Sequence, residues 1–372
     1  MRVVKKAVLA LVVLASLLAL AGFLLPRQVH VERAVSIDAP RTTVFMLVNG
    51  FKLFNRWSPW YALDPGATYT YEGPANGVGA RLVWKGNPDT VGSGSQEILE
   101  SRPYDLVKTR LDFGPQGLAT GQFTLAPDGA AGTRVTWAFD TDLGMNPVSR
   151  YMGLLFDRLV GADFEKGLAS LKQLAESLPK TDFAELEVEL VDVRPVHVAF
   201  IPLTTSTSEG EIATVLAAAY KEIGRFIKRY DLGVAGAPIT INHKWGDGSY
   251  QFDVAVPIDR VPDVSPGAAD SKKTDDKKAD ERKSDDTMPD EAAGAKNPGL
   301  PSVQVKQLPG GRAARTVHVG PDAGMRASYD KLFGWLAAHG YEQAGSPWDE
   351  YVREAGDTPD AQLAANLYVP VK

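Results

Sequence analysis

Cysteine is absent from the 372-residue chain, which excludes disulfides, thiolate nucleophiles and cysteine-based metal sites. The few histidines lie far apart, and no two have the close spacing of zinc ligands. Basic residues form no stripe in the segments expected to fold, and the net charge is −6, which does not fit a nucleic-acid-binding surface. We therefore expect no metal, no cofactor and no nucleic-acid partner.

Length and composition indicate a globular protein with more than one folded part. Hydrophobic residues make up 44% of the chain and charged residues 23%, as in ordinary globular domains. A chain of 372 residues exceeds what one hydrophobic core usually organises, so two domains are expected.

A repeated unit appears in the C-terminal half. Residues 220–238 and 329–347 match in their tyrosine, apolar, glycine and proline positions at a constant offset of 109. Each copy is followed by an alternating strand that ends in proline and one apolar residue, FDVAVPI at 252–258 and ANLYVPV at 365–371. A helix, a turn and a strand recurring in this order predict a duplicated supersecondary unit. SEGE at 208–211 predicts a capping box at the start of the first repeated helix.

Residues 7–25 carry no charge and follow three basic residues, Arg2, Lys5 and Lys6. As a helix this stretch spans about 28 Å, close to the hydrocarbon thickness of a bilayer. The basic residues favour a cytoplasmic N-terminus. The small residues Ala19 and Ala21 leave a cleaved signal peptide open as an alternative. We favour an uncleaved anchor because the apolar run is longer than the core of a usual signal peptide. Both interpretations place the rest of the chain outside the cytoplasm.

The first folded part covers residues 29–179. An alternating strand at 29–37 precedes a helical stretch after Pro40, and short strands with Gly, Pro and Asp turns continue to residue 140. One long helix is predicted at 150–178 from apolar residues spaced three and four apart. This order predicts a helix-grip arrangement, in which a curved antiparallel sheet wraps around the last helix.

Three segments of this part, SIDAPRTTVFMLVNGFKLFNRWSPW, GPANGVGARLVWKG and GTRVTWAFD, resemble the START-like, or polyketide cyclase/dehydrase-like (SRPBCC), superfamily. The resemblance implies an apolar cavity between sheet and helix that binds hydrophobic small molecules or lipids. Trp84 and Trp137 are candidates for its lining, together with Trp57 and Trp60, although each tryptophan also fits a plain core position. The residues form no Ser/His/Asp or paired-carboxylate pattern, so we name no catalytic residue.

The second part covers residues 186–372 and resembles the GyrI-like small-molecule-binding family, most closely in GPDAGMRASYDKLFGWLAAHGYEQAGSPWDEYV. The resemblance implies a pseudo-twofold pair of β-α-β-β units with a ligand groove at their junction, often for aromatic or cationic compounds. Its last strand usually carries an acidic residue where this chain has Asn366, and the symmetry-related position is Asp253. The groove candidates from the family pattern are Trp348, Tyr351 and Tyr368.

Residues 261–300 separate the two repeat copies. Their centre, DSKKTDDKKADERKSDDT, has mixed charge and nothing to bury, which predicts a disordered insertion within the second domain.

Together these features predict an α+β protein with a membrane anchor (1–28), a START-like domain (29–179) and a GyrI-like domain (186–372). We expect it to bind hydrophobic or aromatic small molecules outside the cytoplasm, for sensing, sequestration or hand-over. The residues do not decide whether it is an enzyme, and we favour binding without catalysis. A cyclase or hydrolase acting on such compounds, and an interaction protein using the inserted loop, remain the alternatives.

Overall fold

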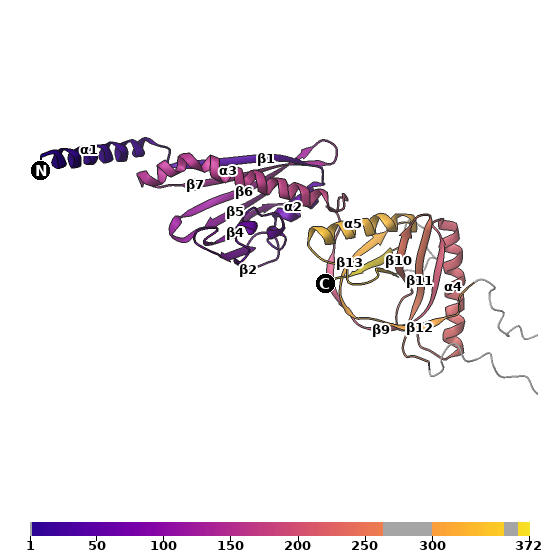
Figure 1. Ribbon diagram of the computed structural model, residues 1–372. Coiled ribbons are helices and arrows are strands. Elements are labelled where there is room, and N and C mark those ends of the chain that lie inside the picture. Colours follow the sequence, from indigo (N-terminus) through magenta and orange to yellow (C-terminus); the bar gives the residue numbers. More distant parts are fainter. Residues whose placement is uncertain (1, 263–299, 353–363) are drawn as a thin grey trace, which may run out of the picture. The chain divides into compact units, whose positions relative to one another are not determined.

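The computed structural model describes residues 2–262, 300–352 and 364–372 (Figure 1). It has the mixed α+β architecture expected from the sequence, with an apolar N-terminal helix and curled antiparallel sheets. The chain divides into two compact units, Met1–Leu186 with Asp330–Tyr341, and Glu187–Tyr329 with Glu342–Lys372. The predicted insertion at 261–300 lies almost wholly outside the described residues.

Helix α1 (Arg2–Leu24) is the apolar segment predicted at the N-terminus. Its residues Val4–Leu24 have a mean hydropathy of 2.8, and almost none of their surface is buried. Within the described ranges, it alone is long and apolar enough to cross a membrane. A signal sequence near the N-terminus meets the same criteria.

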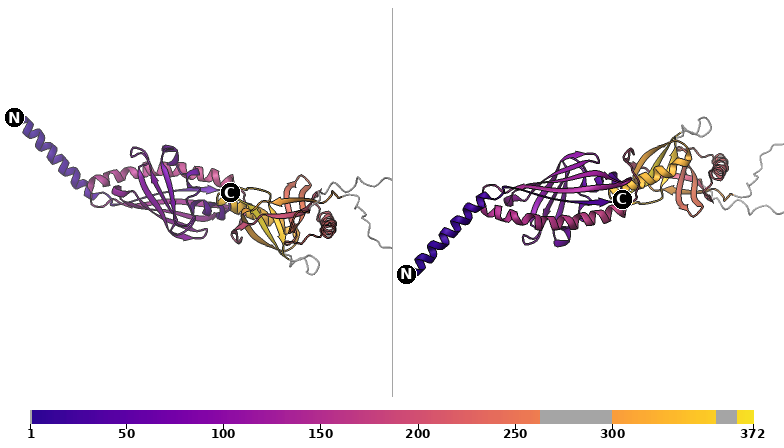
Figure 2. Two further views of the ribbon diagram at one scale, coloured as in Figure 1. Left: turned by 90° about the horizontal axis from the view of Figure 1, so that it is seen from below. Right: turned by 90° about the horizontal axis from the view of Figure 1, so that it is seen from above.

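The first unit holds a seven-stranded antiparallel sheet in the order β1-β7-β6-β5-β4-β3-β2. Two views in Figure 2 show this sheet curled, with the long helix α3 lying along it. The strands are β1 (Gln28–Ile37), β2 (Thr68–Glu72), β3 (Arg81–Lys85), β4 (Ser93–Arg102), β5 (Leu106–Asp112), β6 (Leu118–Asp128) and β7 (Gly132–Asp142), and the helices are α2 (Arg41–Val48) and α3 (Pro147–Glu176). Short 3₁₀ turns follow at Phe54–Arg56, Tyr61–Leu63 and Gly114–Gln116.

Helix α3 begins three residues earlier than the apolar periodicity predicts. The side chain of Asn146 accepts a hydrogen bond from the backbone N–H of Val148 at 2.9 Å, and Pro147 occupies the first turn. Both features favour a helix start, because the cap satisfies a free N–H group and proline needs no hydrogen-bond partner there. Further along, Phe164, Leu168 and Leu171 face the core beneath the sheet.

The second unit contains an eight-stranded antiparallel sheet in the order β12-β9-β11-β10-β14-β15-β13-β8. Elements run β9-α4-β10-β11 in one half and β13-α5-β14-β15 in the other, and β10 pairs with β14 at the centre. The strands are β8 (Glu189–Val193), β9 (Val196–Ser206), β10 (Ile239–Gly246), β11 (Ser249–Ile258), β12 (Gln304–Leu308), β13 (Gly311–Val319), β14 (Trp348–Tyr351) and β15 (Ala364–Pro370), and the first helix is α4 (Glu209–Arg229). Helix α5 (Met325–Ala338), preceded by a 3₁₀ turn at Asp322–Gly324, begins in this unit, and its residues from Asp330 on are assigned to the first unit.

Two hydrophobic clusters lie on this sheet. Helix α4 packs Ala219, Ile223 and Ile227 into one cluster with strands β9 and β11. A second cluster that includes Phe200 and Ile241 is centred on strands β9, β10 and β11.

The predicted capping box at the start of α4 is wrong. Ser208 is the N-cap of α4, but its side chain makes no capping hydrogen bond. The Glu211 carboxylate accepts a hydrogen bond from Ser206 instead.

Candidate ligand-binding sites

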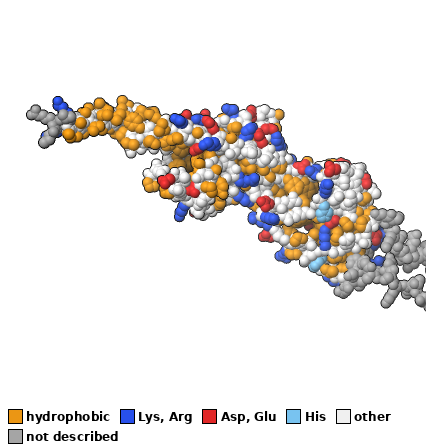
Figure 3. Space-filling view, in the orientation of Figure 1, with side chains coloured by type: hydrophobic (Ala, Val, Ile, Leu, Met, Phe, Trp, Pro, Cys, Tyr) orange, Lys and Arg blue, Asp and Glu red, His pale blue; other side chains and the backbone are white. Residues whose placement is uncertain are grey.

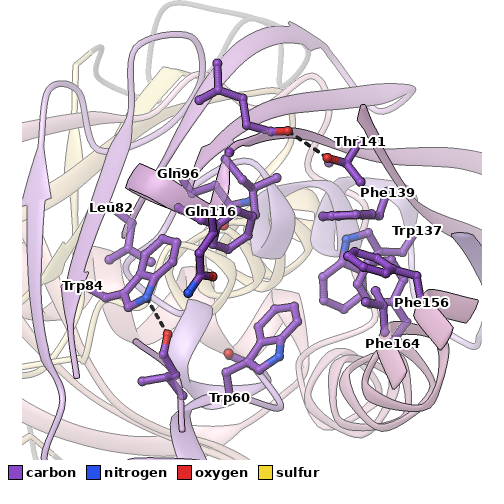
Figure 4. Close-up of a pocket in the computed structure, with 18 of the residues that line it drawn as sticks. Trp60, Leu82, Trp84, Gln96, Gln116, Trp137, Phe139, Thr141, Phe156 and Phe164 are labelled. Carbon is purple, nitrogen blue, oxygen red and sulfur yellow. Dashed lines mark hydrogen bonds between the residues drawn. The ribbon is translucent and has the colours of Figure 1, made fainter. Parts of the chain in front are cut away.

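A cavity of about 430 Å³ lies in the first unit, walled by the sheet and by helix α3 (Figure 4). Most of its wall is aromatic or aliphatic. Two residues predicted from the sequence, Trp84 on β3 and Trp137 on β7, both line it. The other aromatic residues of the wall include Trp60, Phe139, Phe156 and Phe164. Apolar walls with few polar groups are typical of sites for small hydrophobic ligands.

Trp137 is part of both the wall and the core. Its ring stacks on Phe164 of α3 with centroids 3.9 Å apart, and on Phe123 at 4.9 Å. Only 4% of Trp137 is exposed. Trp57, by contrast, is a core residue outside the cavity lining, and its indole N–H donates to the carbonyl of Leu47. The sequence left open whether each tryptophan lines the cavity or fills the core. Trp137 does both, whereas Trp57 belongs to the core alone.

Several polar groups in the cavity wall already have partners. The indole N–H of Trp84 donates to the carbonyl of Val91 at 3.2 Å (Figure 4). Gln96 donates to the hydroxyl of Thr109 at 3.0 Å, and Thr141 donates to a backbone carbonyl at 2.9 Å. A wall whose polar groups are satisfied internally favours contact with apolar surface. No metal-binding group of three or more His, Asp or Glu side chains occurs in the part of the chain that the structure describes.

In the second unit, three of the predicted residues lie together on strands β14 and β15. Trp348 faces Tyr368 across the strand pair, and their rings stack with centroids 4.8 Å apart. The Glu350 carboxylate accepts hydrogen bonds from the side-chain amide of Asn366 at 3.0 Å and the hydroxyl of Tyr368 at 3.1 Å. Burial, followed by the charge of Glu350, raises the pKa of Tyr368, so its hydroxyl stays protonated as a donor.

Asp253 lies on β11 opposite Ile241, which in turn pairs with Trp348. Its carboxylate is buried, with 4% of the residue exposed, and contacts Lys306 of β12 and the Nε2 atom of His243 at 3.0 Å. The carboxylate at the position symmetry-related to Asn366 thus already has a cationic partner. Tyr351 takes no part in this arrangement, because strand alternation directs it to the face opposite Trp348.

Glu350 was missed by the sequence analysis. Its signal is the alternation in WDEY, which puts Glu350 and Trp348 on the same face of β14. The intervening Asp349 points to the other face, where it is buried and accepts a hydrogen bond from Asn242 at 2.8 Å. Asn242 also donates to the hydroxyl of Tyr329 at 3.2 Å. Burial, followed by the charge of Asp349, raises the pKa of Tyr329 well above its usual value.

The first unit thus encloses an aromatic cavity between a curled sheet and a long helix. Comparison with family models identifies a family for each half of the chain. Residues 186–372, half of the chain, match the GyrI-like small molecule binding domain, and the chain belongs to this family. Residues 28–176 match the family described as polyketide cyclase / dehydrase and lipid transport. Both resemblances drawn from the sequence are confirmed.

Among solved structures, the EcmrR C-terminal domain has 13% sequence identity, covers 50% of this chain and 98% of its own, and gives a TM-score of 0.37. Truncated norcoclaurine synthase from Thalictrum flavum has 12% identity, with coverage of 40% and 92% and a TM-score of 0.32. A hydrolase from Listeria innocua has 12% identity, with coverage of 50% and 92% and a TM-score of 0.32. A search of the curated proteins returns no match.

Proposed function

We propose that this chain is a membrane-anchored binding protein for hydrophobic or aromatic small molecules, acting in their sensing, sequestration or hand-over. The observation that carries the proposal is the aromatic cavity of about 430 Å³ in the first unit. This volume falls within the range of pockets that enclose small organic ligands. The family assignments of both halves support a small-molecule ligand.

The chemistry of the cavity wall favours binding over catalysis. A cyclase or hydrolase needs a polar pair that faces the substrate and is free to exchange protons with it. The acidic residue of the wall, Asp142, forms an ion pair with Arg27 at 2.6 Å. The amide of Gln96 and the indole of Trp84 are also engaged within the wall. Because these polar groups are bonded within the protein, a bound ligand contacts mostly aromatic surface.

The proposed organisation has an anchor at residues 1–28, a START-like domain at 29–179 and a GyrI-like domain at 186–372. The apolarity of α1 and the basic residues Lys5 and Lys6 before its apolar run support an anchor that leaves both domains in the periplasm or outside the cell. The matching element orders β9-α4-β10-β11 and β13-α5-β14-β15 support a duplicated β-α-β-β unit in the second domain.

A second binding surface is proposed on β14 and β15. The stacked rings of Trp348 and Tyr368 offer an aromatic plane, and Glu350 adds a carboxylate beside them. An aromatic plane next to a negative charge suits a cationic aromatic compound. Glu350 supplies the charge that Asn366 lacks at the family position.

The test is a ligand screen on the full chain in detergent micelles, by native mass spectrometry and thermal shift. The panel contains lipids, neutral aromatics and aromatic cations. A ligand present at 100 times its Kd stabilises the folded state by about 2.7 kcal/mol, which is readily measured. Trp84→Ala alters the cavity and Trp348→Ala alters the second surface. Trp245→Ala, an exposed tryptophan outside both, is the matched control.

Binding that is lost in one site variant and retained in Trp245→Ala assigns the ligand to that site. An absence of any stabilisation across the panel, with all proteins folded, contradicts the proposal and favours the interaction-protein alternative.

A further inference from the structure

The outward face of the first turns of α3 is apolar. Val148, Met152, Leu155 and Leu159 are between 46% and 68% exposed, and their spacing of four, three and four residues puts them on one side of the helix. We call these four residues the α3 stripe. The first ten residues of α3 contain one charged side chain, Arg150, which is buried. A helix that faces water normally carries polar residues on its exposed side, so we expect the stripe to contact an apolar partner.

The stripe begins where the apolar helix α1 ends. The hydroxyl of Tyr151 donates to the carbonyl of Leu18 at 2.8 Å, and Arg150 donates to the carbonyl of Phe23 at 2.7 Å. Gly22 lies so close to Pro147 that an added Cβ would come within 2.6 Å of its side chain. The last turns of α1 are thus packed against the first turns of α3. Figure 3 shows hydrophobic side chains continuing from α1 onto the adjoining part of the unit.

The cavity opens at this same end of the sheet. Strand β1 starts at Gln28, directly after α1, and Gln28 pairs with Asp142 at the end of β7. Leu118, at the start of β6, pairs with Asp112 at the end of β5. Asp142 and Leu118 line the cavity, as does Thr90 in the β3–β4 hairpin, and all three are exposed. Lining residues that are also exposed mark the mouth of the cavity, and they gather at the end where α1 joins.

We propose that this end of the first unit docks on the surface of a phospholipid bilayer, with the α3 stripe in the interfacial layer and the cavity mouth facing the lipid. We choose a bilayer as the partner because the stripe continues the apolar surface of α1, the helix that fits a membrane span. An apolar ligand then passes between bilayer and cavity without crossing water. The docking rests on the proposed membrane anchor, and this last step rests in addition on the proposed binding of an apolar ligand.

The absence of native cysteine allows single labels to test the docking. The full chain is inserted in phosphatidylcholine vesicles and carries an environment-sensitive fluorophore at Val148→Cys, Met152→Cys or Leu155→Cys. Ala130→Cys, an exposed position in the β6–β7 hairpin at the other end of the sheet, is the control. Doxyl-labelled phosphatidylcholine is expected to quench the three stripe labels and to leave the Ala130 label unaffected.

Equal quenching at all four positions, or none at the stripe, overturns the docking. Stripe labels shielded in a protein-concentration-dependent way without lipid quenching also overturn it, and assign the face to contact between copies of the chain.

The entry route is tested with pyrene as the probe ligand and Met152→Asp as the variant, with Met152→Leu as the conservative control. A charged side chain in the stripe removes apolar contact with the lipid, so pyrene uptake from vesicles is expected to slow about tenfold or more. Equilibrium binding of pyrene in detergent is expected to stay unchanged. Equal uptake rates in Met152→Asp and wild type overturn the entry route. Absent equilibrium binding in wild type counts against the proposed function, and the quenching measurement still decides the docking.

Discussion

Replacing Lys306 with methionine removes the cation that faces the buried carboxylate of Asp253. The Asp253 side chain is 6% exposed, and Lys306 is 31% exposed. Removing one partner of a buried ion pair typically costs about 3–5 kcal/mol, because the other charge stays buried without compensation. Lys306 is partly solvated and His243 remains near the carboxylate. We therefore expect a loss near the lower limit, about 3 kcal/mol.

The reciprocal change is predicted to be milder. In Asp253→Asn the Lys306 ammonium can turn towards water, so we expect a loss of about 1–2 kcal/mol. The double variant is expected to lose less than the sum of the two, because neither charge is then left alone, with a coupling of about 2 kcal/mol. Lys244→Met is the matched control. Lys244 is exposed and 3.9 Å from Asp247, and such surface pairs contribute less than about 1 kcal/mol.

Hydrogen exchange measured at increasing urea concentration on the full chain is the suitable assay. The two units need not unfold together, so a single unfolding transition would not isolate the effect. Peptides covering β9 and β11 report the stability of the second sheet directly. The reasoning is refuted if Lys306→Met changes their exchange no more than Lys244→Met, or if the two single effects simply add.

Three further outcomes are expected. Trp137→Ala removes a ring that stacks on Phe164 in the core, so we expect the first unit to lose about 3–5 kcal/mol of unfolding free energy. Hydrogen exchange of first-unit peptides measures this loss, and a value under about 1 kcal/mol would contradict the central position of the ring. A hydrogen bond to Asp140 raises the pKa of His30. The contribution of protonated His30 to folding stability is therefore present below the ordinary histidine pKa and is lost as pH rises through the raised value. His30→Gln is therefore expected to destabilise the first unit slightly at pH 5 and not at pH 8, because the site is largely exposed, and an NMR titration without a raised pKa would disprove this. Glu350→Gln is expected to weaken the binding of an aromatic cation about tenfold and to leave the binding of a neutral aromatic unchanged. Calorimetry that shows equal losses of affinity for both would argue against a charge-based role.

The elements of the chain were largely predictable because they depend on local pattern. Periods of two and of three to four residues marked the strands and the long helix. The start of α3 was misplaced because its cap, Asn146, precedes the apolar pattern. The capping box at Ser208 failed because Glu211 found a different partner, Ser206, two residues before the cap.

The candidate site was less predictable because its contacts join residues far apart in the sequence. The Glu350 carboxylate accepts hydrogen bonds from Asn366 and Tyr368 on the neighbouring strand. The carboxylate of Asp253 forms an ion pair with Lys306, which lies 53 residues further along the chain. Strand register decides such pairings, and register is set by the whole sheet.

The order β12-β9-β11 has a practical consequence for handling the protein. Strands β11 and β12 both pair with β9 in the antiparallel sense, so they run parallel to each other with one strand between them. A connection between parallel strands needs about a dozen residues. The chain uses residues 259–303, more than three times that length. Most of this segment is therefore expendable for closing the sheet, and it offers an internal position for an affinity tag or a reporter domain, away from α1 and from the C-terminal strand β15.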